Sequence, residues 1–260
     1  MIGRAYPMGY TTAMISSVFN ATVYNPLYNG LVSIVGVLPS HDVGIAVIIL
    51  TIVVRVVLYP LSKKAILAQQ KMKKIAPEME LLKEKYKNDR EQQGKAMFAL
   101  YKQNDIHPFA SFGLILIQLP ILFALYWVFA FGGLPEIDIA RLYSFVSEPA
   151  GANMEFIGLI NMAGKSVVLA VLAAATQIIY TRLSMGARKK TAPSESASSF
   201  GQGSFGKDMA KSFDIQMRYV LPIFIGVVAY TVPSAAALYW VTSNSAMIAQ
   251  ELLMGRRFRE

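Results

Sequence analysis

An arginine stands inside an apolar segment that is long enough to cross a bilayer. Residues 43–61 are rich in Val, Ile and Leu, yet they include Arg55, and Thr51 precedes Arg55 by one helical turn. If a helix begins at Val43, Arg55 lies about 18 Å along it, with roughly 12 Å of a ~30 Å hydrocarbon core still to cross. A charge at that depth costs between ~2.5 and more than 10 kcal/mol, depending on how much water reaches it. The chemistry that Arg55 could provide is therefore electrostatic.

Two interpretations of Arg55 are open. The apolar segments supply no carboxylate at comparable depth, since Glu251 lies near the cytosolic end of the last one and is expected at the membrane interface. The guanidinium is therefore expected to face a water-filled recess that opens to the cytosol. In the alternative, backbone carbonyls or lipid phosphates hold Arg55, and its role is structural.

Uncharged polar side chains lie in the other apolar segments at spacings that place several on shared helix faces. In the third segment, Thr176 with Tyr180 and Gln177 with Thr181 form i, i+4 pairs. Taken singly, such residues are typical of contacts between membrane helices. Taken together with the arginine, they predict a hydrated groove in the inner half of the membrane, with these candidate substrate-binding residues: Arg55, Thr51, Gln118, Gln177, Tyr180, Trp240, Ser243 and Asn244.

Catalysis is not expected. His41 and His107 both lie outside the apolar segments, no aspartate pair lies within them, and the chain has no cysteine. Two distant histidines do not predict a metal site. The Ser/Gly-rich stretch contains a G-x-G-x-x-G match at 201–206, but no strand precedes it, so no dinucleotide site follows. We predict no catalytic residue, no cofactor and no metal.

Composition predicts an all-α polytopic membrane protein. Of 260 residues, 54% are hydrophobic and 16% charged, well below the ~25% charged of a soluble domain. Five segments approach the ~20 residues that a bilayer requires. The predicted spans are 43–61, 109–131, 166–183, 215–231 and 234–253, the last two forming a tight hairpin at Val232-Pro233.

The formal net charge of +9 is unevenly spread. Lysine and arginine crowd the loops after the first and third predicted spans and the tail 254–260, whereas four carboxylates outnumber the basic residues between the second and third spans. Because positive loops stay in the cytosol, we expect the N-terminus outside and the C-terminus inside. Residues 1–42 would then be extracytoplasmic, 43–253 the five-span core, and 184–213 a flexible cytosolic loop.

Within residues 1–42, Asn25-Pro26 predicts a helix cap and start, followed by apolar residues at helical spacing. We predict that this amphipathic helix lies at the interface of the outer leaflet. Packing on the bundle is the alternative, because periodicity alone does not choose between the two.

The basic segment at about 65–103 predicts a cytosolic helical hairpin. Two apolar stripes run along it, and Asn88-Asp89 supplies the turn and the cap of the second helix. A charge run of this kind is commonly a solvated face. Candidate recruitment residues in it are Lys71, Lys73, Lys74, Pro77, Glu78, Lys83 and Lys85.

Two motifs resemble the YidC/Oxa/Alb family of membrane protein insertases. They are the span-embedded arginine followed by proline and a lysine pair in "IVVRVVLYPLSKK", and "LYWVTSN" in the last span. The likeness extends from about 25 to 251. It implies five transmembrane helices around a hydrophilic groove, with Arg55 as the groove arginine, Gln177 as a polar residue of the third span and Trp240 as an aromatic of the fifth.

The resemblance further implies a membrane protein insertase and chaperone. Its partners would be nascent membrane proteins and the lipid bilayer, with the Sec translocon, the ribosome and the signal-recognition-particle pathway as further candidates and no nucleic-acid specificity. In contrast with many Gram-negative members, we expect no large extracytoplasmic domain before the core, and the tail is short. Two other classes stay open: an assembly chaperone without autonomous insertion, and a transporter, which the lack of intramembrane carboxylates disfavours.

Overall fold

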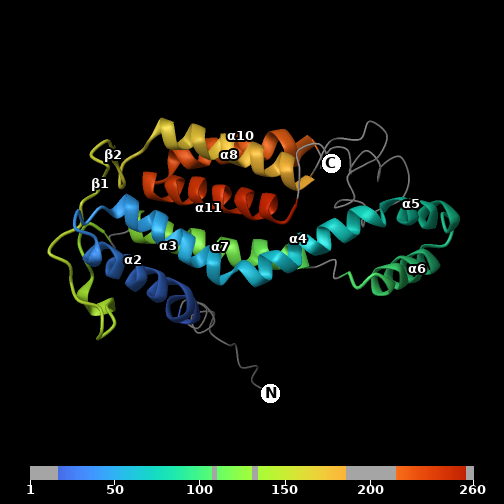
Figure 1. The fold of residues 1–260 in the computed structure, drawn as a ribbon, viewed down its shortest axis with the longest axis horizontal. Coiled ribbons are helices and arrows are strands. Elements are labelled where there is room, and N and C mark those ends of the chain that lie inside the picture. The colour runs from blue at the N-terminus through green and yellow to red at the C-terminus, as the bar shows by residue number, and fades with distance from the viewer. Residues whose placement is uncertain (1–16, 107–109, 131–133, 186–214, 256–260) are drawn as a thin grey trace, which may run out of the picture. The chain divides into compact units, whose positions relative to one another are not determined.

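The computed structural model describes residues 17–106, 110–130, 134–185 and 215–255, and most of them are helical (Figure 1). Contacts divide the chain into two compact units. Unit 1 combines Met1–Val54, Ile117–Ala173 and Val227–Ser243; unit 2 combines Arg55–Leu116, Ala174–Gly226 and Asn244–Glu260. The predicted loop 184–213 lies outside the described residues from 186 onward, as do His107, most of the tail and residues 1–16.

The first predicted span is broken near its end. Helix α3 runs from Val43 to Val57 and α4 from Tyr59 to Lys74, with a bend of 63° between them. Pro60 explains the break, because proline has no N–H to donate and its ring collides with the carbonyl four residues earlier. The helix that carries Arg55 therefore ends four residues before the predicted limit at Leu61, and Arg55 lies in its last turn.

The other predicted spans also correspond to helices. Their bounds are Ala110–Ala130 (α7), Val167–Met185 (α8), Gln216–Val220 with Leu221–Thr231 (η4 and α10), and Ser234–Leu253 (α11). By length and hydropathy α8 alone among the described helices suffices to cross a bilayer, and the bent pair α3–α4 would be a second if it were one span. The coarse prediction of a helical protein is confirmed, whereas five crossings stay a prediction.

Helix α2 (Asn25–Val37) packs within unit 1. Tyr28, Leu31, Val32 and Val35 are fully buried, and a Cβ on Gly30 would lie 3.2 Å from Leu50 Cδ1 of α3. This burial favours the packed alternative over a helix that only rests on lipid. The predicted cap at Asn25 is wrong, because a π-helical turn, η1 (Asn20–Tyr24), leads directly into α2 and no side chain caps it.

Side chains of α2 also fasten the segment after α7. Asn29 donates to the carbonyl of Arg141 and accepts from the amide of Tyr143, and the Tyr28 hydroxyl accepts from the amide of Asp138, next to the short helix η2 (Ile139–Arg141). Burial raises the pKa of the Tyr28 hydroxyl above its usual value near 10.

A small hairpin covers the start of α3. Strands β1 (Glu155–Phe156) and β2 (Ile160–Asn161) pair antiparallel. The buried carboxylate of Asp42 accepts from the amide of Ile45, which caps α3, and from the amide of Ile157 in the hairpin turn. Phe156 lies against Gly44, where an added Cβ would overlap the phenyl ring.

In unit 2, helices α5 (Ala76–Lys85) and α6 (Arg90–Gln103) form an antiparallel hairpin after α4 (Figure 1). Its core contains Ile75, Met79, Leu100 and Ile106, four buried residues from both sides of the turn. Asp89 caps α6 by accepting from the amide of Gln92 at 3.0 Å, as the sequence predicted. Whether this hairpin is cytosolic stays a prediction.

Replacing Gly44 with alanine should destabilise the protein by about 1–3 kcal/mol, because the added methyl group overlaps Phe156 Cβ as well as its ring. Thermal unfolding of the full chain in detergent measures the effect. Gly94→Ala is the matched control: it lies in α6 with nothing within 4 Å of the new Cβ, so it should stabilise by roughly 0.5–1 kcal/mol. An unchanged midpoint for Gly44→Ala would contradict the close approach.

Candidate functional site

Arg55 and Thr51 lie one turn apart on α3. Thr51 is buried, and its hydroxyl donates to the carbonyl of Val47 at 2.6 Å, within its own helix. Arg55 is half-buried in the last turn of α3, where the helix dipole is negative and favours a cation. Of this pair, the charge remains partly accessible and the hydroxyl does not.

A polar cluster joins α8 to α11 in unit 2. Asn244 donates from Nδ2 to Gln177 Oε1 at 2.9 Å, and the same nitrogen lies 3.5 Å from Thr176 Oγ1. Gln177 in turn donates from Nε2 to Thr181 Oγ1 at 3.2 Å. Gln177 is 8% exposed and Asn244 5%, so the two amides face each other and turn away from the surface. This arrangement fastens two helices together.

A second polar contact joins α7 to α11 in unit 1. The side-chain amide of Gln118 donates to the hydroxyl of Tyr239, which is 2% exposed. The sequence indicated Gln118 but not Tyr239, although the tyrosine stands next to Trp240 in the same motif. A partner from a distant segment leaves no periodic signal.

Of the eight predicted groove residues, four are buried and four are half-buried. Ser243 is buried like Thr51, Gln177 and Asn244. The other four are half-buried: Arg55, Gln118, Tyr180 and Trp240. Only these four retain surface with which to meet a substrate, and the gathering of all eight residues around one groove stays a prediction.

A further polar contact, between α4 and the last turns of α11, was not predicted from the sequence. Ser62 of α4 and Gln250 of α11 are hydrogen-bonded through Ser62 Oγ and the Gln250 amide group, at 2.9 Å to Oε1 and 2.8 Å to Nε2. Glu251, next along the chain, is fully buried in unit 2, although the sequence favoured an interfacial carboxylate there.

The predicted recruitment residues also differ in their contacts and in their exposure. Lys71 donates to the carbonyls of Asn104 and Asp105, and Lys73 to that of Ser184, so both lysines fasten the hairpin and α8 to α4. Lys83 is half-buried. Like Lys71 and Lys73, the remaining four are exposed: Lys74, Pro77, Glu78 and Lys85.

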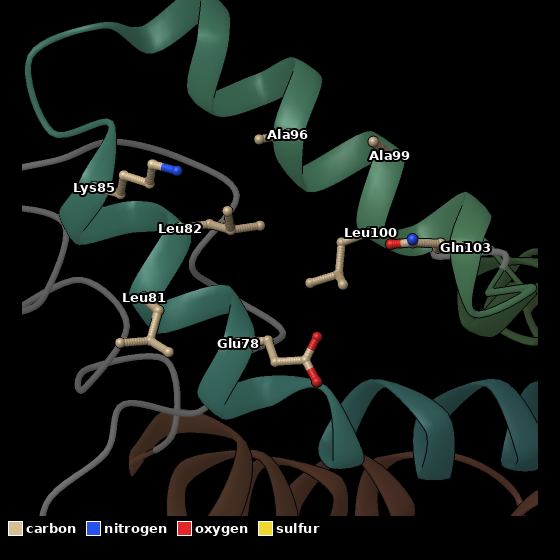
Figure 2. Close-up of a pocket in the computed structure, with 8 residues that line it drawn as sticks. All are labelled: Glu78, Leu81, Leu82, Lys85, Ala96, Ala99, Leu100 and Gln103. Carbon is tan, nitrogen blue, oxygen red and sulfur yellow. The ribbon is translucent and has the colours of Figure 1, made fainter.

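A hollow of about 410 Å³ lies between α5 and α6 (Figure 2). Leu82 and Leu100 point toward each other across it, whereas Glu78 and Lys85 lie toward opposite ends. The hairpin thus presents an apolar floor with one charge of each sign beside it. In the part of the chain that is described, no group of three His, Asp or Glu residues could hold a metal ion.

Known proteins resemble this chain over most of its length. The model of the 60Kd inner membrane protein family matches residues 36–260. A membrane protein insertase YidC of Clostridium perfringens is 34% identical over 206 residues, which cover 79% of this chain and 75% of that protein. A protein of the same name from Fusobacterium nucleatum is 28% identical over 240 residues, covering 90% and 98%. In Syntrophobacter fumaroxidans, such a protein is 30% identical over 84% of this chain but 35% of its own length.

The Gln177–Asn244 contact should appear as a coupling between two substitutions. Gln177→Leu and Asn244→Leu each remove the hydrogen bond between the two amides and leave the partner amide in place, whereas the double variant removes both amides. We expect the double variant to be more stable than the sum of the two losses predicts, by about 0.6 kcal/mol and at most ~1.7. Chemical unfolding of the full chain in mixed micelles measures the cycle.

The control pairs Asn244→Leu with Ile179→Ala, a substitution on the exposed side of α8. Those two changes should add without coupling. Additivity in both cycles would mean that the amides do not support each other.

Proposed function

The chain belongs to the 60Kd inner membrane protein family, which includes the YidC insertases, and from this membership we propose that it inserts proteins into the bacterial inner membrane. It would act as an insertase and chaperone that receives hydrophobic segments of nascent membrane proteins and releases them into the bilayer. We assign it no catalysis, because binding and release suffice for this task.

The observation that carries the proposal is the position of Arg55. It is half-buried, in the last turn of an apolar helix, and the chain turns by 63° just beyond it. A guanidinium in such a place holds water around itself, since its hydration is too favourable to be given up. We propose that Arg55, Gln118, Tyr180 and Trp240 face a hydrated groove that opens to the cytosol.

The division of the chain into two units supports the proposal of five crossings. The helical segment of each of the five predicted spans begins in one unit and ends in the other, and successive spans do so in opposite senses. The basic stretch 63–102 belongs to unit 2, whereas the carboxylates Glu136, Asp138, Glu148 and Glu155 belong to unit 1. By the positive-inside rule, this segregation supports an N-terminus outside and a C-terminus in the cytosol.

The proposed mechanism lowers the cost of moving a polar segment across the membrane. An incoming tail, preferably acidic, would meet water and positive charge in the inner leaflet and so cross a shorter stretch of hydrocarbon, where each unsatisfied backbone group costs several kcal/mol. Its apolar part would then slide into lipid. The driving forces are apolar burial and the membrane potential, the latter worth ~2.3 kcal/mol per charge per 100 mV.

The hairpin of α5 and α6 is the proposed recruitment element. Pro77, Glu78 and Lys85 are exposed on α5, and Lys74 is exposed at the end of α4. Together with the apolar hollow between α5 and α6, they offer both charge and apolar surface to an arriving chain. The Sec translocon, the ribosome and the signal-recognition-particle pathway are proposed as further partners.

The test reconstitutes the purified full chain into sealed liposomes with a small single-span substrate that carries an acidic N-terminal tail. Protection of the tail from protease scores insertion. Arg55→Ala should reduce the initial rate by roughly tenfold, equivalent to about 1.4 kcal/mol, whereas Arg55→Lys should retain most of it because the charge stays. Arg182→Ala, which removes an exposed arginine from the end of α8, is the matched control.

Equal insertion by wild type, Arg55→Ala and Arg55→Lys would exclude a role for the charge and leave Arg55 structural. No protection above empty liposomes would favour an assembly chaperone or a Sec-dependent protein. In that event, a flux assay on the same proteoliposomes would test the transporter alternative.

A further inference from the structure

The turn of the β1–β2 hairpin is strained and strongly apolar. Ile157 and Gly158 both have positive φ, at 53° and 68°, and the amide of Leu159 donates to the carbonyl of Phe156 at 3.0 Å. This is the pattern of a type I′ turn, whose first central position favours Asn, Asp or Gly. A β-branched residue in the left-handed region is a genuine outlier, so Ile157 needs a compensating reason.

Burial in the protein does not provide that reason. Ile157 is 65% exposed and Leu159 82%, so neither side chain contributes much to the core of unit 1. A sequence that tolerates strain in order to expose two large aliphatic groups indicates a surface that meets something apolar.

The turn is held firmly in place. Asp42 accepts from the amide of Ile157 at 2.9 Å, and just after β2 the amide of Met162 donates to the carbonyl of Met154 at 2.8 Å. The carbonyl of Met162 accepts from Ala235, and that of Gly164 from Ser234, both in the first turn of α11. The two exposed side chains therefore project from a fixed support rather than from a loose loop.

The bilayer is the apolar partner within reach. Helix α8 begins at Val167, six residues after β2 ends, and the hairpin lies at the N-terminal end of α8 in Figure 1. Val167, Val168 and Val171 are exposed on this helix, which is long and apolar enough to cross a membrane. If α8 crosses the membrane, the hairpin at its N-terminal end would lie near the level where that helix leaves the hydrocarbon. Phe145, 81% exposed, adds an apolar aromatic group in the same connection between α7 and α8, and such a side chain can be buried at the membrane interface.

We propose that Ile157 and Leu159 insert into the interfacial layer of the leaflet at the N-terminal end of α8. The hairpin would act as a fixed anchor that sets the depth of α3, α8 and α11 through Asp42 and the first turn of α11. This inference requires only that the protein be embedded in a membrane; it is independent of insertase activity and of which side the N-terminus faces.

The absence of cysteine from the chain makes a direct test possible. Leu159→Cys, labelled with a small fluorophore, is reconstituted into liposomes of brominated phospholipid. Val171→Cys on α8 serves as the lipid-facing reference. Gly151→Cys is the matched control, because Gly151 is an exposed residue of the same connection with open space around its Cβ. We expect roughly threefold stronger quenching at Leu159 than at Gly151, and more from bromines near the headgroups than from deep ones, as for a group buried ~5–10 Å at the interface.

Two results would overturn the proposal. Quenching at Leu159 no stronger than at Gly151, with full access for aqueous iodide, would place the tip in water. Protection from both iodide and brominated lipid would mean that a protein, either a second copy or a partner, covers the tip.

A second variant tests whether the strain serves this contact. Ile157→Asn suits the left-handed position, so it should raise the thermal midpoint of the full chain in detergent by about 2 °C. In liposomes the same change should weaken lipid quenching of a label at Leu159 by roughly half, because one of the two inserted groups becomes polar. A lower midpoint, or unchanged quenching, would separate the strain from membrane contact and overturn the argument from the turn.

Discussion

A polar group in hydrocarbon must find a partner within the protein, and this constraint organises the bundle. The interhelical polar contacts of Gln118, Asn244 and Gln250 all involve α11, through Tyr239 to α7, Asn244 to α8 and Gln250 to α4. At about 100° per residue, Asn244 points roughly 140° away from Tyr239, whereas Gln250 returns to within about 20° of it. Helix α11 therefore makes polar contacts on two of its faces. The Ser, Thr, Asn and Gln residues of α11 lower its hydropathy. For this reason α11 does not resemble a spanning helix by composition, although it is long enough to cross a bilayer.

The sequence could predict features that depend on local spacing. The apolar stripes of α5 and α6, the cap at Asp89 and the Gln177–Thr181 pair all follow from helical periodicity within one segment, and each is present. Partners from distant segments could not be predicted. Nothing near Gln118 indicates Tyr239, and nothing near Asp42 indicates that its carboxylate holds a hairpin turn more than 100 residues later. Asn25 failed as a cap because a π-helical turn continues upstream, a backbone feature without a clear residue code.

Burial changes the meaning of the candidate site. The sequence treated Thr51, Gln177, Ser243 and Asn244 as groove-lining groups, since polarity in an apolar segment is all that a sequence records. Thr51 donates to a carbonyl of its own helix, the amides of Gln177 and Asn244 bond to each other, and all four side chains are buried. The half-buried candidates are one cation, one amide and two amphipathic aromatics. That set suits transient contact with chains of varied sequence, because aromatic faces and a hydrated guanidinium accept many partners without a fixed geometry.

The break after Val57 helps to explain how a charge is tolerated in an apolar segment. Pro60 withholds the N–H that the carbonyl of Val56 would receive in a continuous helix, and the end of α3 leaves further carbonyls without helical donors. These oxygens form the negative end of the helix dipole beside Arg55. A helix end is thus a less costly place for an arginine than the middle of a straight span. In the proposed groove the proline and the arginine would act together: the bend would supply hydrogen-bond acceptors and access for water, and the charge would keep that water in place.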